Sequence, residues 1–244
     1  MGLNLPVPAS ALAIGAHPDD VEFGCGATLA KWAAGGCVVH HLVCTDGSKG
    51  TWDPHQDLAE LVARRHEEQR DAAKALGATG EVVFLGWPDG ELESGLRQRG
   101  EVAYWMRRLR PDVVLGHDPW RRYRLHPDHR HAGFLTVDGV VAARDPHFFP
   151  DQPVEHHRPS ALLLFEADEP DHVEDADDEA VARKLAALEA HRSQLRSTMR
   201  VEPGSAEEGA QLAAFRARVN DRLVAHGTIA GVARGEAFKA ITDL

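Results

Sequence analysis

The chain has 244 residues, of which 43% are hydrophobic and 27% charged, a composition that excludes disorder, collagen and coiled coil as descriptions of the whole protein. Its length suits one large α/β domain or two small ones. The 27 Lys and Arg residues against 38 Asp and Glu give a formal charge of −11, which repels phosphate backbones and anionic lipid, so neither nucleic acid nor a membrane is expected as a partner.

Apolar strand-like runs alternate with segments of helical character along most of the chain. In chain order we expect a strand at 11–16, a helix at 27–36, a strand at 38–44, a helix at 58–76, a strand at 82–85, a helix containing 102–109, a strand at 113–116, a helix at 129–143, a strand at 161–165, and helices at 180–195 and 210–225. Strands that alternate with helices form βαβ units. The pattern therefore predicts the α/β class, as a Rossmann-like sandwich with a mostly parallel sheet flanked by helices.

No linker, repeat or low-complexity tract divides the chain, so a single domain is expected over 1–244. Its motif-bearing core spans about 11–195, and 196–244 are interpreted as a C-terminal helical extension. Two segments are interpreted as surface loops. They are 144–159, which is rich in Pro and His, and 166–179, whose nine acidic residues suit a solvated loop leading into a helix.

Cysteine usage and the first residues bear on the compartment. The chain has three cysteines, Cys25, Cys37 and Cys44, and no C-x-x-C pair, so we expect reduced thiols in apolar surroundings. Residues 1–10 lack the basic and apolar regions of a signal peptide, and no apolar run is long enough to cross a membrane. These features predict a cytoplasmic protein.

Histidine and aspartate residues follow four of the expected strands. In α/β folds, ligands bind beyond the carboxyl ends of the strands, near the point where the strand order reverses. The residues in question are His17, Asp19 and Asp20 after the first strand, Asp46 and Ser48 after the second, Asp89 after the third, and His117, Asp118, His126, Asp128 and His129 after the fourth. The four loops are expected to converge on one edge of the sheet.

Three of these residues form a candidate metal site. Imidazole and carboxylate are good ligands for divalent ions, and a catalytic zinc site needs about three protein ligands with one position left for water. His17 and Asp20 lie three residues apart on a tight turn stiffened by Pro18, so both side chains can face one point. His129, which opens the fourth helix, can supply the third ligand. We expect Zn²⁺, with Fe²⁺ or another divalent metal as the alternative.

The neighbouring residues supply the proton transfers that hydrolysis requires. Asp19 lies beside a ligand without being one, so it can take the proton of a metal-activated water. His126 can stabilise a tetrahedral intermediate or protonate the leaving group, with Asp128 fixing its tautomer. Taken singly, H-P-D-D also fits a polar turn and H-P-D-H a helix N-cap. Their joint occurrence favours metal-assisted hydrolysis of an amide or ester.

Five further residues are candidates for substrate contact, each with a structural alternative. Arg65 either reaches into the cleft or lies on a solvated helix face. Asp46, Ser48 and Asp89 either contact sugar hydroxyls or serve only as turn residues. His191 either lies near the site or simply ends a helix.

Several short strings carry a family resemblance. Residues 16–22 (AHPDDVE) with 24–29 (GCGATL), and residues 126–129 (HPDH), look like the two metal-binding motifs of the PIG-L/LmbE-like deacetylases. Weaker matches are 191–194 (HRSQ), which is similar to a late H-x-S-Q motif of that family, and 65–68 (RHEE) with the helix that follows. The likeness covers roughly residues 11–195.

The resemblance implies a Rossmann-like fold and a zinc-dependent amidohydrolase that typically removes acetyl from an N-acetylglucosamine unit. The roles that it assigns are metal ligand for His17, Asp20 and His129, general base for Asp19, electrostatic partner or acid for His126, and orienting residue for Asp128. One departure concerns Arg124, which stands where some members carry a tyrosine that helps to hold the oxyanion. Arg124 can take that role or bind an anionic substrate.

Three functions are compatible with these features. The first is a zinc-dependent N-deacetylase of a small glucosamine-containing glycoside. The second is an amidase that cleaves a thiol S-conjugate or another glycoside conjugate at the same site. The third, from another class, is a non-catalytic metal-dependent sugar-binding protein, which would have no need of a base such as Asp19. Related enzymes often form homo-oligomers, so the resemblance is compatible with such an assembly, but no interface can be identified in the sequence.

Overall fold

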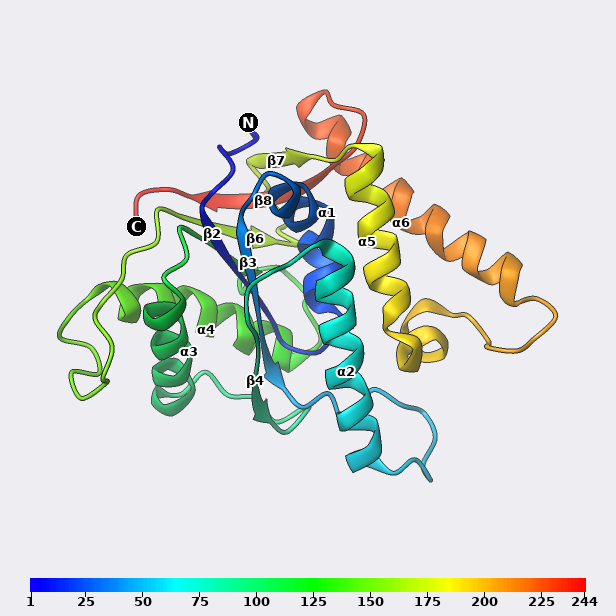
Figure 1. Ribbon diagram of the computed structural model, residues 1–244, viewed down its shortest axis with the longest axis horizontal. Helices are drawn as coiled ribbons and strands as arrows, with labels where there is room; N and C mark the ends of the chain where they lie inside the picture. The colour runs from blue at the N-terminus through cyan, green and yellow to red at the C-terminus, as the bar shows by residue number, and fades with distance from the viewer.

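The computed structural model describes residues 1–244 and contains one eight-stranded sheet, in the order β1-β7-β8-β6-β5-β2-β3-β4 (Figure 1). The strands are β1 (Gly2–Leu3), β2 (Ser10–Gly15), β3 (Val38–Thr45), β4 (Val82–Trp87), β5 (Val113–His117), β6 (Ala161–Phe165), β7 (His172–Asp175) and β8 (Gly235–Ile241). The α-helices are α1 (Asp20–Ala34), α2 (Leu58–Leu76), α3 (Leu96–Leu109), α4 (Pro127–Arg144), α5 (Asp178–Ala190) and α6 (Glu208–Ala230). A 3₁₀ turn (Arg192–Gln194) and a π-helical turn (Leu195–Met199) follow α5.

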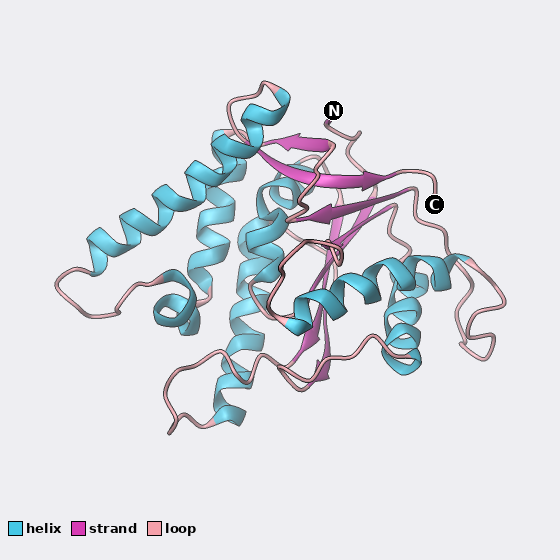
Figure 2. Cartoon of the chain, turned by 180° about the vertical axis from the view of Figure 1, so that it is seen from behind, coloured by secondary structure: helices cyan, strands magenta, loops and turns pink.

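Helices cover both faces of the sheet, as Figures 1 and 2 show from opposite sides. The centre of β2 explains why both faces are covered. Ala11 and Ala13 belong to a core shared with α1, α5 and α6, whereas Leu12 and Ile14 belong to a core shared with α3 and α4. Successive side chains of a strand point to opposite faces, so an unbroken apolar run requires cover on both. The expected α/β sandwich with a mostly parallel sheet is confirmed.

Several helix boundaries follow from local sequence. The Asp57 carboxylate accepts hydrogen bonds from the N–H groups of Ala59 and Glu60 at the start of α2. The same helix ends at Gly77, whose φ of 84° is the left-handed conformation that glycine adopts without steric cost. The predicted bounds of this helix, 58–76, agree with the structure.

The sequence-based expectations were wrong for both outer parts of the sheet. The acidic segment 166–179 was expected to be a solvated loop, but it contains β7, in which Glu174 is fully buried beside His172 and Lys31. The 196–244 segment is more than a helical extension, because β8 pairs antiparallel with both β6 and β7. Hydropathy could not identify β7, because the charge of its buried carboxylate is balanced by Lys31, which is distant in sequence.

The first helix also begins seven residues earlier than the expected position 27. Its backbone breaks at Cys25, which has a non-helical φ of −146°. The Glu236 carboxylate of β8 accepts hydrogen bonds from the N–H groups of Ala27 and Thr28, at 3.1 and 2.8 Å. Glu236 therefore caps the second part of α1 in the way that an N-cap residue caps a whole helix. It also forms a buried ion pair with Lys184, with 2.6 Å between Nζ and Oε1.

Replacement of Glu236 is expected to destabilise the fold. The Glu236→Ala substitution leaves the buried Lys184 ammonium without its partner and α1 without its internal cap. Removal of one member of a buried ion pair typically costs about 3–5 kcal/mol, so we expect the free energy of unfolding to fall by about that amount in urea titrations. The double variant with Lys184→Met should recover part of the loss. A decrease below about 1 kcal/mol in the single variant would contradict this account of the pair.

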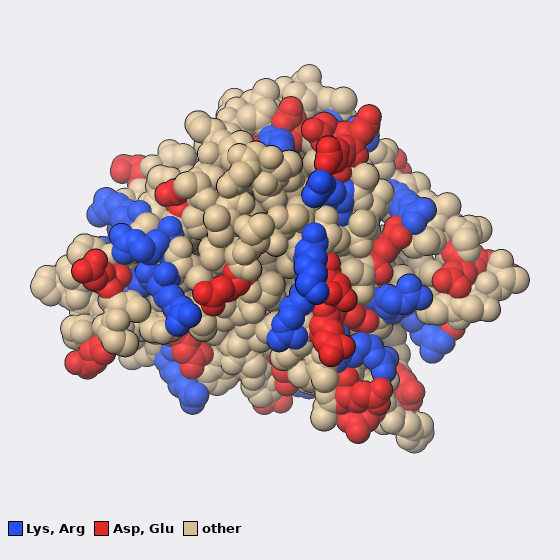
Figure 3. All heavy atoms as spheres, viewed as in Figure 1, with Lys and Arg blue, Asp and Glu red and all other residues tan.

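Charges on the outer surface are mixed in sign. Figure 3 shows acidic and basic side chains side by side over α2, where Arg64 pairs with Glu60 and Lys74 pairs with Asp71. Such exposed pairs contribute little to stability. None of the helices is long and apolar enough to cross a membrane, and all three cysteines are buried free thiols, as expected.

Candidate metal centre and active site

The predicted loops meet at the point where the strand order reverses. From β2 the chain proceeds to β3 and β4 on one side of the sheet and later to β5 and β6 on the other. The loops after β2 and β5 therefore begin side by side, at the position where α/β sheets bind ligands. The helix α4 can approach closely because Gly133 has no side chain, since a Cβ there would lie 2.7 Å from the His117 carbonyl oxygen.

Three donor groups converge at this point from the loop after β2 and the first turn of α4. His129 Nε2 lies 3.2 Å from His17 Nδ1 and 3.3 Å from Asp20 Oδ1. His17 Nδ1 in turn lies 3.3 Å from Asp20 Oδ2. The structure thus brings together the three residues that the sequence predicts as metal ligands.

The spacing of these donors fits a tetrahedral divalent ion. In a tetrahedral site with ligand bonds of about 2.0–2.1 Å, the ligand atoms lie about 3.3 Å from one another. The two imidazole nitrogens are 3.2 Å apart, and each is 3.3 Å from the Asp20 oxygen nearer to it, which is Oδ2 for His17 and Oδ1 for His129. The surrounding charge also favours a cation, because the carboxylates of Asp19, Asp20, Asp89 and Asp128 are all at least nine-tenths buried. Burial of so many carboxylates is costly unless a cation balances them.

Asp128 orients a different histidine from the one predicted. Its Oδ2 lies 3.2 Å from Nε2 of His17 and has no hydrogen bond to His126. The carboxylate is fully buried and also accepts hydrogen bonds from the N–H groups of Gly90 and Leu92. With Nε2 of His17 donating to a carboxylate, Nδ1 is left free to bind a metal, an arrangement common among metal-ligating histidines. Asp89 Oδ1 lies at the same distance of 3.2 Å from this Nε2.

Asp19 occupies a strained position next to the ligands. Its φ of 104° lies in the left-handed region, which is uncommon for a residue with a side chain. Its backbone N–H donates to Oε1 of Gln69, a fully buried residue of α2, over 3.0 Å. Burial raises the pKa of the Asp19 carboxyl to about 6, and the Arg65 guanidinium, whose Nη2 is 3.7 Å from Oδ2, acts against this rise.

We expect Gln69 to matter for catalysis because it holds this backbone. The Gln69→Met substitution keeps the side-chain length but removes the acceptor for the Asp19 N–H. The substitution also removes the donor to Glu22 Oε1. The hydrogen bond to Asp19 alone, at about 1–1.5 kcal/mol, corresponds to a decrease in kcat of about tenfold, so we expect a decrease of at least that size. KM and metal content should change little, which distinguishes mispositioning from loss of the site. The neighbouring Arg70→Met variant is the control, and an equal decrease in both variants would contradict the assignment.

His126 stands at the open rim of the site. It is exposed and precedes α4, and its ring has no hydrogen bond to the protein. The ring stacks on His129 at 4.9 Å between centroids and meets His17 edge-on at 4.6 Å. Burial together with the charges of His17 and His129 lowers its pKa. A ring nitrogen of His126 is therefore free to contact a bound molecule.

The structure directs Arg124 away from the pocket, contrary to both roles foreseen for it. Tyr123 adopts a left-handed φ of 58° and points outward, and Arg124 turns inward and is nine-tenths buried. Its Nη1 donates to Glu166 Oε2 over 2.8 Å and to His117 Nδ1 over 3.0 Å. Since a guanidinium can only donate, the His117 proton lies on Nε2, which faces Asp20 Oδ2 at 3.3 Å. Arg124 thus acts on Asp20 through His117.

Glu166 was missed as part of the site, and His117 was expected at this edge of the sheet but was given no role. Burial acts to raise the pKa of Glu166, but His117 and Arg124 hold it well below its usual range. Glu166 follows β6 directly, and His117 ends β5. Both therefore lie at the same edge of the sheet as the predicted loops, and that placement was the available signal.

The remaining candidates divide into pocket residues and supporting residues. Arg65 is nearly fully buried and lines the pocket, where its guanidinium donates to the carbonyl oxygens of Gly47 and Pro18. Asp46 and Ser48 do not line the pocket. The Asp46 carboxylate accepts the N–H groups of Ser48 and Asp89, which is turn chemistry.

His191 also lies behind the pocket rather than in it. It is fully buried, and its Nε2 is 3.3 Å from the carboxylate of Glu22. Glu22 also accepts a hydrogen bond from Gln69 over 2.7 Å, so the buried group connects to the residue that holds Asp19. Neither Glu22 nor Gln69 was predicted, because a buried polar residue of a helix has no sequence signature of its own.

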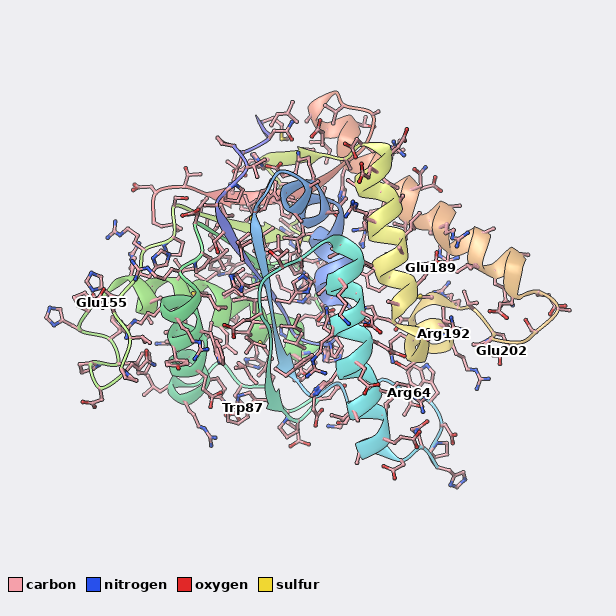
Figure 4. All side chains as sticks on the ribbon, viewed as in Figure 1. Arg64, Trp87, Glu155, Glu189, Arg192 and Glu202 are labelled. Atoms are coloured by element: carbon pink, nitrogen blue, oxygen red, sulfur yellow. The ribbon has the colours of Figure 1, made fainter.

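A pocket of about 530 Å³ opens over the metal-ligand candidates. Its lining includes Asp19, Asp89, His126 and Arg65, and the loop 49–52 and Gln194 form another wall. Figure 4 shows this region between the end of β4, marked by Trp87, and the turn after α5, marked by Arg192. The exposed Trp52 ring lines the same wall. The pocket combines one buried polar floor with an open rim, so it can admit a small polar molecule.

Comparison with known proteins gives concordant matches. The family model described as PIG-L, GlcNAc-PI de-N-acetylase, matches residues 12–140, more than half of the chain. The diacetylchitobiose deacetylase of Thermococcus kodakarensis is 37% identical over 186 residues, covering 75% of this chain and 69% of that protein. A 1D-myo-inositol 2-acetamido-2-deoxy-alpha-D-glucopyranoside deacetylase of Streptomyces avermitilis is 33% identical over 166 residues, covering 57% of this chain and 55% of that protein. The solved structure of the N,N'-diacetylchitobiose deacetylase of Pyrococcus horikoshii aligns with a TM-score of 0.83 and 29% identity over 96% of this chain and 84% of that one.

Proposed function

Because the chain belongs to the PIG-L family of deacetylases, we propose that it hydrolyses the acetamide of an N-acetylglucosamine-containing glycoside with the help of a divalent metal. We propose Zn²⁺ as this metal. The observation that carries this proposal is the convergence of His17 Nδ1, His129 Nε2 and the Asp20 carboxylate at the floor of an open pocket. The two nitrogens lie 3.2 Å apart, and each lies 3.3 Å from a different oxygen of Asp20. Asp19 and His126 line the same pocket.

The proposed ligand set is His17 Nδ1, the Asp20 carboxylate and His129 Nε2. A bound divalent ion supplies a water of lowered pKa and polarises the substrate carbonyl. Asp128 and Asp89 hold the ring of His17 so that Nδ1 faces the metal position. His117 holds Asp20 in the same way from the other side.

The protein residues then move two protons. The Asp19 carboxylate accepts the proton that the attacking water releases, and the backbone hydrogen bond to Gln69 keeps this carboxylate in position. In its protonated form, which its lowered pKa makes the minor form at neutral pH, His126 stabilises the oxyanion and donates a proton to the amine nitrogen as the C–N bond breaks. Water adds to the acyl carbon and the amine leaves, so the products are acetate and a glucosamine. Arg65 lies close enough to Asp19 to hold the substrate or the base.

Acetate release from N-acetylglucosamine, N,N′-diacetylchitobiose and an N-acetylglucosaminyl-inositol tests the proposal. The protein is stripped with a chelator and reloaded with Zn²⁺ or with Fe²⁺ under anaerobic conditions. We expect acetate from at least one glycoside only after reloading, and the metal that restores the higher kcat/KM identifies the preferred cofactor. Metal bound in equimolar amount without acetate from any of the three would reject the proposed substrate class and favour the cleavage of a thiol S-conjugate or other glycoside conjugate. The assembly state and the cytoplasmic location stay predictions.

A further inference from the structure

A second cavity, of about 320 Å³, adjoins the catalytic pocket. It lies between α1, α5, α6 and the loops after β5 and β6. Four residues line both cavities, namely Phe23, Glu166, Thr198 and Arg222. The two cavities are therefore neighbours that meet at these side chains, and a substrate too large for the first would have to pass them to reach the second.

One side of α6 forms an amphipathic wall of this cavity. Phe215, Val219 and Leu223 recur at intervals of four and are buried against the core. Arg218 and Arg222, also four residues apart, line the cavity beside them. Residues three and four apart share one face of a helix, so the apolar and cationic stripes run next to each other.

Where the two cavities meet, the arginine side chains outnumber the carboxylates that could neutralise them. The carboxylate of Glu166 accepts a hydrogen bond from Arg124 over 2.8 Å, while Arg121 and Arg222 lie farther from it, at 3.5 and 3.9 Å. One carboxylate thus faces three arginines. Asp168 is the other acidic residue near Arg121, at 4.0 Å.

Arg218 has no carboxylate partner at all. Its Nη2 donates to the Met199 carbonyl oxygen over 2.7 Å, and its guanidinium lies 5.8 Å from the centre of the Phe215 ring. Lys184 contrasts with it, because Glu236 neutralises that ammonium at 2.6 Å. The protein as a whole has a formal charge of −11. A group of arginines on a cavity wall with too few carboxylate partners is nevertheless suited to bind an anion.

We propose that this cavity, called here the α6 subsite, binds the part of the substrate that lies beyond the glucosamine ring. We further propose that this part of the substrate carries a carboxylate or a phosphate. The residues that define the α6 subsite are Arg121, Phe215, Arg218, Val219, Arg222 and Leu223. The inference rests on the proposed function. The matched family region, 12–140, contains neither α6 nor Glu166. Most residues of the α6 subsite thus come from a part of the chain outside that region. Changes in these residues can alter the substrate preference without changing the proposed metal ligands or Asp19.

Two glycosides of equal size separate charge from shape. The 4-carboxyphenyl and 4-carbamoylphenyl β-glycosides of N-acetylglucosamine differ only in a carboxylate and a neutral amide. For the Zn²⁺-loaded enzyme we expect kcat/KM to be about tenfold higher for the carboxylate, the effect of one hydrogen bond to a charged group. The 4-(aminomethyl)phenyl glycoside, which is cationic, should be a poorer substrate than the amide. This comparison needs no variant.

Arg218→Gln should reduce the ratio between the carboxylate and amide substrates to about one, and Arg218→Lys should retain part of it. The matched control is Arg216→Gln on the same helix. Arg216 pairs with Glu189 of α5, which Figure 4 labels, and does not line the cavity, so this variant should keep the ratio. Thermal unfolding of each variant verifies that it folds.

The outcomes separate the two proposals. Equal kcat/KM for carboxylate and amide in the wild-type enzyme, or a preference that survives Arg218→Gln, overturns the α6 subsite while acetate release still supports the deacetylase. Absence of acetate from these glycosides and from N,N′-diacetylchitobiose overturns the proposed function and the subsite with it.

Discussion

Asp19→Asn is expected to lower kcat by about 100- to 10,000-fold, the usual contribution of a general base. Asparagine has the same shape and tolerates the positive φ of position 19, so the backbone can keep its conformation. Its amide cannot accept a proton from water at neutral pH. Because Asp19 is not among the proposed ligands, metal content should stay the same as in the wild-type protein.

Steady-state kinetics on N,N′-diacetylchitobiose, together with metal analysis of the same samples, checks this prediction. The matched control is Asp71→Asn, an exposed aspartate on α2 that pairs only with Lys74. It should leave both kcat and metal content unchanged. If Asp19→Asn kept more than about a tenth of the wild-type kcat, another group would have to be the base.

His129→Ala is expected to abolish activity by a different route, through loss of the metal. It removes one of the three proposed donor groups, so the remaining His17 and Asp20 hold an incomplete site. Substitution of a residue that only orients a ligand costs about 10- to 100-fold in metal affinity. We therefore expect Asp128→Asn to fall in that range and His129→Ala to lose more.

Thermal unfolding with and without a chelator provides a readout independent of activity. A ligand that binds only the folded state stabilises it by about 2.7 kcal/mol when present at 100 times its Kd. Chelation should therefore lower the Tm of the wild-type protein and leave that of His129→Ala unchanged. His131→Ala, whose ring contacts Ser94 away from the pocket, is the control. Stoichiometric metal in His129→Ala would falsify the proposed ligand set.

The central sheet could be predicted because its strands are apolar on both faces. Residues such as Leu12 and Ile14 identify β2 whatever their partners are. The outer strand β7 differs, because it buries Glu174, whose carboxylate pairs with Lys31 of α1. A buried charge is stable only with its partner present, and pairing between distant residues is not visible in local hydropathy.

The candidate site shows the same division. The positions of His17, Asp20 and His129 follow from loops that leave neighbouring strands, so sequence spacing sufficed to place them together. The direction of each side chain depends on details that spacing does not contain. The left-handed φ of Tyr123 turns Arg124 inward, and the first turn of α4 directs Asp128 at His17 instead of His126.

The cap that Glu236 places on α1 has a consequence for synthesis of the protein. Asp20, a proposed ligand, lies in the first turn of α1, just ahead of the break at Cys25, and the carboxylate that stabilises the helix after the break comes from the last strand. During translation the N-terminal half can collapse, but this helix keeps unpaired N–H groups until β8 has left the ribosome and joined the sheet. We therefore expect the competent metal centre to form only after β8 has joined the sheet, so that metal is acquired late in folding.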